Sequence, residues 1–204
     1  MLFYTFYRRV FGESYYFCKN KRMAETTKIN IKGFAMQYGT FIGVVWIACF
    51  AGFIGEFRHE SLSALVFWGS IASVIMSGVF ARRFRSSVIG NALTGGRAFS
   101  TTWAFCMQMF LYASILAAAA HYIYFAHMDH GYLLSAYKAY INRPEIKQVM
   151  VQMASKEQLD LVISTWQAMT PLNFTFEFFI LNLIIGLILS LPIAMIGSRA
   201  KVKP

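Results

Sequence analysis

Four long apolar segments decide what this chain can fold into. They run at about residues 34–55, 62–81, 101–126 and 174–197, and the first two contain no charged residue. A bilayer core of roughly 30 Å needs ~20 apolar residues in a helix. Because lipid offers the backbone no hydrogen bonds, single segments of this length span as helices. The sequence therefore predicts an all-α membrane protein with four transmembrane helices.

The composition agrees with this prediction. The chain has 204 residues, of which 57% are hydrophobic and 14% are charged, whereas a soluble domain has ~25% charged residues. The formal net charge of +10 would suggest a nucleic-acid partner for a soluble chain. In a membrane protein, basic loops instead face the anionic headgroups of the lipid bilayer. We predict no nucleic-acid partner.

The charges of the connecting segments predict how the chain is oriented. Basic residues dominate the N-terminal tail, the connection at residues 82–100 and the C-terminal tail. The other two connections together carry five basic and six acidic residues. Since basic connections stay in the cytoplasm, we expect both termini to be cytoplasmic. We divide the chain into a basic tail (1–32), a transmembrane domain (33–199) and a short second tail (200–204).

The first 22 residues leave two readings open. Residues 1–17 are rich in aromatic residues but too short to span a bilayer, and the basic residues follow the apolar run rather than precede it. That order argues against a secretory signal. The segment is either an interfacial helix or the product of a wrongly assigned start, with Met23 as the true first residue.

The segment at 127–173 is too long for an unstructured loop. Pro144 is suited to the first turn of a helix, and Ser155 with Gln158 matches a capping box that opens another. Apolar residues then recur at helical spacing, namely Leu159, Val162, Ile163, Trp166 and Met169. We expect two short amphipathic helices forming an outer cap. They either pack on the bilayer and the bundle or offer a surface to a partner.

Small residues recur four positions apart within the spans. The sets are Gly39 and Gly43; Gly69, Ser73 and Ser77; Ala113 and Ala117; and Gly186 and Ser190. Small residues at this spacing let helix backbones approach closely in lipid. We favour packing within one chain over dimerisation.

Two ionisable residues inside the spans are candidates for function, because such groups are costly in lipid. His121 and Glu177 are expected at a similar depth near the outer surface. As a pair they could relay protons or bind a polar headgroup. Each also has a structural explanation: Glu177 falls in the first turn of its predicted helix, where the helix dipole favours negative charge. His121 can stay neutral near interfacial water.

No other residues suggest catalysis, and we predict no enzyme activity and no cofactor. His127, Asp129 and His130 follow the third span, but metal sites need three or four converging ligands, so we predict no metal site. Arginines at 82, 83, 85 and 97 are expected to contact anionic lipid at the cytoplasmic surface.

Several segments carry a resemblance to a known family. They are Gly95-Gly96-Arg97-Ala98-Phe99, the apolar span Phe110 to Phe125 with its exit Tyr122-Ile123-Tyr124-Phe125 and Asp129, the region Glu145 to Met169, and Leu183 to Pro192. From Ile31 to Lys201 the chain resembles domain-of-unknown-function family 4199, small four-span proteins of the bacterial inner membrane. Arg97 stands where family members often carry an acid, so a role for that acid does not transfer.

The resemblance lends no established activity, but it implies a role in the cell envelope, since members are encoded beside a membrane-associated glycosyltransferase. We expect a non-enzymatic accessory or scaffold subunit that binds a membrane protein, with a lipid-linked glycosyltransferase as one candidate, or forms a homo-oligomer. The alternative is a small proton-coupled carrier of a solute or lipid that uses His121 and Glu177. A membrane enzyme built on the His127 cluster is the least favoured hypothesis.

Overall fold

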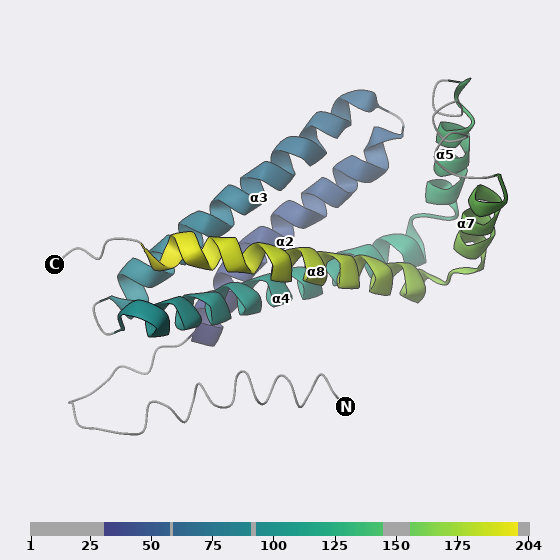
Figure 1. Ribbon diagram of the computed structural model, residues 1–204. Coiled ribbons are helices and arrows are strands. Elements are labelled where there is room, and N and C mark those ends of the chain that lie inside the picture. The colour runs from purple at the N-terminus through teal and green to yellow at the C-terminus, as the bar shows by residue number, and fades with distance from the viewer. Residues whose placement is uncertain (1–30, 58, 91–92, 145–155, 200–204) are drawn as a thin grey trace. The chain divides into compact units, whose positions relative to one another are not determined.

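The computed structural model describes residues 31–57, 59–90, 93–144 and 156–199. Within these residues the chain forms six α-helices and no β-strand (Figure 1). In chain order they are α2 (Ile31–Glu56), α3 (Ser63–Phe84), α4 (Gly95–His127), α5 (Tyr132–Ile141), α7 (Lys156–Ala168) and α8 (Pro171–Ser198). A 3-10 turn (Glu60–Leu62) precedes α3, and a π-helical turn (Arg85–Ile89) follows it. The predicted all-α class is confirmed for this part of the chain.

Four of the helices are long and apolar enough to cross a membrane, as predicted. They are α2 with 26 residues, α3 with its π-turn (27 residues), α4 with 33 and α8 with 28. Most of their ends lie outside the predicted spans, because a helix can continue its backbone hydrogen bonds beyond the apolar core. At a rise of 1.5 Å per residue, α4 is about 50 Å long and exceeds a bilayer core of roughly 30 Å.

Three predictions fall outside the described residues. They are the two readings of residues 1–22, the C-terminal tail at 200–204, and the helix that Pro144 was expected to open across 145–155. From Lys32 onward the described helices belong to one compact unit, Lys32–Pro204.

Helix α4 is the most buried of the four spans, and α8 runs along it (Figure 1). Gly186 of α8 lies so close to Phe110 that a Cβ at position 186 would come within 2.7 Å of the Phe110 Cβ. Further along the same contact, Trp103 Nε1 donates a hydrogen bond to Ser190 Oγ at 3.0 Å. Ser190 is fully buried, so this bond satisfies polar groups inside an otherwise apolar contact.

Helix α2 packs on another side of α4 through two glycines. A Cβ on Gly39 would lie 2.6 Å from the Met109 carbonyl oxygen, and one on Gly43 would lie 3.2 Å from that of Ala113. These approaches bring the two backbones nearly into contact. Aromatic rings fill the space beside the glycines: Trp46 stacks on Phe110 with ring centroids 6.0 Å apart.

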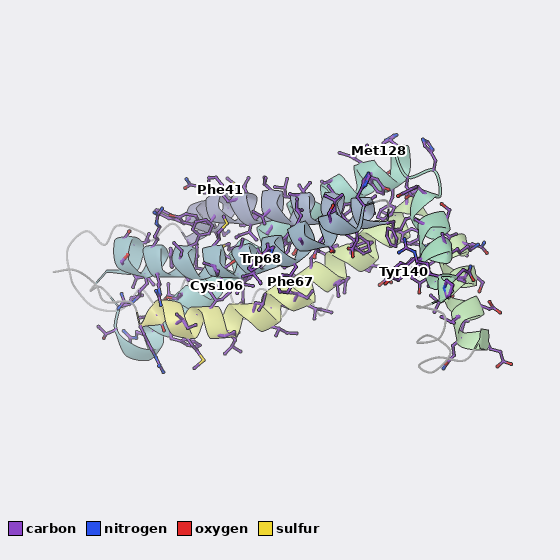
Figure 2. The ribbon with its side chains drawn as sticks, turned by 90° about the horizontal axis from the view of Figure 1, so that it is seen from above. Phe41, Phe67, Trp68, Cys106, Met128 and Tyr140 are labelled. Carbon is purple, nitrogen blue, oxygen red and sulfur yellow. The ribbon has the colours of Figure 1, made fainter. Side chains whose placement is uncertain are left out.

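Helix α3 is buried along one narrow line, formed by Ser73, Ser77, Ala81 and Phe84. At its end Phe84 stacks on Phe105 of α4 with centroids 4.1 Å apart, and Gly197 of α8 approaches Ala81 closely. The opposite side of α3 faces outward: Phe67 and Trp68, labelled in Figure 2, are 61% and 64% exposed. Large exposed apolar side chains are expected where a helix faces lipid.

The small residues therefore serve contacts within this chain. Gly39, Gly43 and Gly186 each meet a neighbouring helix of the bundle, and Gly69 meets the Cys49 sulfur of α2. Ala113, Ala117, Ser77 and Ser190 are fully buried. The prediction that these residues pack the bundle is confirmed for the described contacts.

The predicted helix ending before Thr170-Pro171 is present as α7, whereas α5 was not predicted. The two helices contact each other, with the Tyr137 and Trp166 rings 4.8 Å apart. Trp166 also contacts Phe174 of α8 at 6.0 Å, and Tyr140, labelled in Figure 2, lies 6.2 Å from Phe57 at the end of α2. Trp166 of α7 is thus packed within the chain, whereas Leu161 and Val162 of the same helix are exposed.

Candidate functional site

His121 lies in the last third of α4, on the side that faces α2 and α8. Its side chain is 2% exposed. The Phe50 ring of α2 lies 4.1 Å from the imidazole, and the Phe178 ring of α8 lies 5.2 Å from it, measured between centroids. Three helices therefore converge on this one polar side chain.

More aromatic rings surround the histidine. Phe125, one turn further along α4, lies 5.9 Å from both Phe50 and Phe178 and stacks on Phe174 at 5.0 Å. We call His121, Phe50, Phe125, Phe174 and Phe178 the aromatic box. Since Phe174 also contacts Trp166, the box connects the spans to α7.

Inside the aromatic box the imidazole has an unsatisfied atom. His121 Nδ1 is buried and has no hydrogen-bond partner among the described residues. Leaving a buried polar atom unpaired costs about 1–3 kcal/mol. A polar group held at this cost, in the middle of a well-packed contact, is the strongest candidate for a functional residue in the spans.

The structure does not pair His121 with Glu177. Glu177 is exposed, and its carboxylate is not bonded to the imidazole, whose Nδ1 lacks a partner. The reason is the rotation of α8: neighbouring helical positions are 100° apart, and Phe178 is the one that faces the histidine. His121 and Glu177 thus lie toward the same end of the bundle. Glu177, however, is on a side of α8 that does not face the histidine.

The prediction that Glu177 lies in the first turn of its helix is wrong. Helix α8 begins at Pro171, with the Thr170 hydroxyl accepting a hydrogen bond from the Asn173 N–H as its cap. Glu177 therefore lies in the second turn rather than the first. Because the helix dipole acts mainly within the first turn, it gives Glu177 little stabilisation.

Gln108 is a second buried polar residue on α4, at 8% exposure. Its Oε1 atom also has no partner in the part of the chain that the structure describes. This oxygen therefore accepts no interhelical hydrogen bond from the described residues.

The residues that follow α4 have a structural role. The Asp129 carboxylate accepts hydrogen bonds from the N–H groups of Gly131 and Leu133, at 3.0 and 2.9 Å. It thereby caps the start of α5. His127 and His130 are both exposed, and the described residues contain no group of three His, Cys, Asp or Glu side chains placed to hold a metal ion.

Replacing Asp129 by alanine is therefore expected to loosen α5 and leave the spans intact. Loss of a capping carboxylate costs about 1 kcal/mol. Hydrogen exchange followed by mass spectrometry should show faster exchange across 131–141 and unchanged exchange in α4 and α8. An H127A variant is the control, since it changes an exposed residue just before the same turn. Equal exchange in D129A and wild type would contradict the capping role.

The four arginines predicted to contact lipid do not share one environment. Arg82, Arg83 and Arg97 are exposed. Arg85 is only 7% exposed, because its Nη1 donates to the Gly90 carbonyl and its Nε donates to the Ser198 carbonyl at 3.3 Å. The prediction of lipid contact is therefore wrong for Arg85, which ties the end of α3 to the end of α8.

Sequence reasoning missed Arg199 and the role of Arg85. Arg199 ends α8 and is exposed, and it was not among the arginines expected to contact lipid. For Arg85 a signal was available: it continues, at intervals of four, the small-residue line Gly69, Ser73, Ser77 and Ala81. A residue on that line faces the bundle, so Arg85 could have been separated from Arg82 and Arg83.

Comparison with known proteins gives a single family result. A family model described as "Protein of unknown function (DUF4199)" matches residues 37–199. No curated protein matches the chain, and no solved structure does.

Proposed function

The chain belongs to the DUF4199 family of proteins of unknown function, and from this premise we propose that it is a non-enzymatic accessory or scaffold subunit of cell-envelope machinery. As a multi-pass membrane protein it would hold a partner enzyme in position rather than transform a substrate. A glycosyltransferase that uses a lipid-linked donor is the partner class we favour. The bacterial inner membrane is the proposed location.

The observation that carries the proposal is the continuity of packing from one end of the bundle to the other. Gly197 against Ala81, Gly186 against Phe110 and Gly39 against Met109 bring the spans to backbone contact. The aromatic box then continues through Phe174 and Trp166 to α7. A well-packed interior resists deformation, which suits a protein that fixes the position of another.

The proposed orientation follows from charge. Arg82, Arg83, Arg97 and Arg199 lie where α3 and α8 end and α4 begins, whereas Glu56, Asp129, Glu157, Asp160 and Glu177 lie toward the other end. Because basic ends stay inside, we place the arginines and both termini in the cytoplasm. Helices α5 and α7 would then lie on the outer side.

A second candidate function, a small proton-coupled carrier, is favoured by one observation. The buried His121 Nδ1 has no partner, and a buried imidazole can exchange a proton. Glu177 does not support this candidate, because it is exposed and separated from the imidazole by the rotation of α8. We therefore rank the carrier second.

Replacing His121 by leucine distinguishes the two candidates. Leucine fills a similar volume and removes the unpaired nitrogen, so we expect the variant to be at least as stable as the wild type, with the free energy of unfolding raised by up to about 3 kcal/mol. Purified chain is reconstituted in vesicles that contain a pH-sensitive dye, and a membrane potential is imposed. A scaffold should give wild-type, H121L and E177Q vesicles the same proton leak as vesicles without protein.

The contrary result is equally clear. Proton flux in wild-type vesicles that H121L abolishes, while the variant remains folded, would exclude the scaffold as the sole function. Flux lost in E177Q as well would restore the pair predicted from the sequence.

A further inference from the structure

Three helices meet at the end of the bundle that carries the exposed arginines. A Cβ on Gly197 of α8 would lie 2.8 Å from the Ala81 Cβ of α3 and 3.3 Å from the Thr102 Cγ2 of α4. Arg82 is adjacent to Ala81, Arg199 follows Gly197 by two residues, and Arg97 precedes Thr102 by less than two turns. Figure 1 shows the end of α3, the start of α4 and the end of α8 at the same side of the bundle.

The arginines around this junction have no counter-charge within the described residues. Arg82, Arg83, Arg97 and Arg199 are exposed and form no ion pair there. The acidic residues that the structure describes lie toward the opposite end of the bundle. We call these four residues the arginine junction. Four uncompensated guanidinium groups around one helix junction form a site for an anion.

Arg85 joins the two helix ends that carry Arg82 and Arg199. Its hydrogen bond to the Ser198 carbonyl holds the end of α3 against the end of α8, next to Arg82 and Arg199, and its bond to the Gly90 carbonyl closes the turn after α3. Since that bonding uses Arg85 itself, it is not part of the site. The junction is thus preorganised, which lowers the ordering cost of binding.

The surface beside the arginine junction is apolar. On α3, Ile75 and Val79 are 61% and 44% exposed, and on α8, Met195 and Ile196 are 46% and 53% exposed. These side chains lie within two turns of Arg82 or Arg199, toward the interior of the spans. An anion bound here would have its charge at the arginines and an apolar portion along α3 and α8, as a lipid does.

We propose that the arginine junction binds one anionic lipid whose headgroup carries two phosphates. A guanidinium group binds phosphate through paired N–H donors, so four arginines from three helices can hold two phosphates better than one. Basic sites between spans on the cytoplasmic side bind such headgroups. The inference deepens the proposed function by naming a lipid ligand. It rests on the membrane arrangement proposed there but not on the identity of any partner enzyme.

The test is native mass spectrometry of the full-length chain in a mild detergent, titrated with cardiolipin. Phosphatidylglycerol at the same phosphate concentration is the comparison lipid. We expect one cardiolipin to bind per chain and to saturate, with an affinity about 10-fold higher than phosphatidylglycerol because two phosphates bind together. An R82Q/R199Q variant should bind about 30-fold more weakly, given the contribution of each arginine near the surface.

A charge-matched variant at the other end is the control. K138Q/R143Q removes the same charge on and beside α5, and it should bind cardiolipin as the wild type does. An R82K/R199K variant keeps the charge and tests the guanidinium geometry if R82Q/R199Q does not fold; it should show intermediate affinity. Inorganic diphosphate is added separately to test whether phosphate alone occupies the junction.

Each contrary outcome overturns the inference. Binding that depends only on total phosphate, or that weakens equally in both glutamine variants, would indicate diffuse attraction. Unchanged affinity in the lysine variant would exclude guanidinium recognition, and displacement of cardiolipin by equimolar diphosphate would exclude a lipid site. The lipid titration contains no partner enzyme. A negative result would therefore overturn the lipid site and leave the scaffold proposal untouched, which the proton-flux and co-purification experiments test.

Discussion

Replacing Arg85 by methionine is expected to lower the free energy of unfolding by about 2–3 kcal/mol, the effect of losing hydrogen bonds from a charged donor and leaving partly buried acceptors unpaired. Methionine keeps the length and apolar stem of the arginine, so the space stays filled. The substitution removes the bond to the Ser198 carbonyl, which joins α3 to α8, and the bond to the Gly90 carbonyl, which closes the turn after α3. The measurement is denaturant unfolding in detergent micelles, followed by tryptophan fluorescence.

Arg82 supplies the matched control for this substitution. It lies one turn before Arg85 but is exposed, so R82M should change stability by less than about 0.5 kcal/mol. Equal effects of R85M and R82M would mean that Arg85 does not join the helices. Replacing a buried charge by an apolar residue can also stabilise a protein, and a more stable R85M variant would contradict the account in the same way.

The second large effect is expected at Gly39. An alanine Cβ there would lie 2.6 Å from the Met109 carbonyl oxygen and 2.9 Å from the Tyr112 Cβ. A backbone oxygen cannot rotate away as a side chain can, so α2 and α4 must separate. Overpacking of this kind costs about 1–3 kcal/mol, and the separation also weakens the contact of Trp46 with Phe110. Unfolding in detergent, with fluorescence as the readout, measures the loss.

Gly78 is the control for Gly39. It lies in the middle of α3, and a Cβ there meets nothing within 4 Å. Replacing it by alanine should stabilise the chain by about 0.5–1 kcal/mol, because alanine favours the helix. G39A and G78A should therefore change stability in opposite directions. Two stabilised variants would show that α2 does not approach α4 at Gly39.

The number of spans and the use of small residues could be predicted from the sequence because both depend on one-dimensional patterns. Uncharged segments such as 34–55 must become helices in lipid. The spacing of Gly39 and Gly43 marks the side where a helix can approach its neighbour. These features need no knowledge of which residues meet across the bundle.

The site could not be predicted in the same way, because it depends on the rotation of each helix. A shift of one position along α8 decides whether Glu177 or Phe178 faces His121, and hydropathy does not resolve 100° of rotation. The aromatic box could not be recognised either. In an apolar span, a buried phenylalanine cannot be distinguished by sequence from one that faces lipid. Helix α5 was missed because its cap, Asp129, was considered as a metal ligand rather than as a helix start.

The central claim, that the chain is a scaffold for a membrane enzyme, is tested most directly by its composition in native membranes. The protein is purified from those membranes in a mild detergent, and every co-eluting polypeptide is quantified by mass spectrometry. The account predicts one membrane enzyme in fixed ratio to the chain, equally in wild type, H121L and E177Q. A chain that elutes only with copies of itself and a bound solute, lost in H121L, would contradict it.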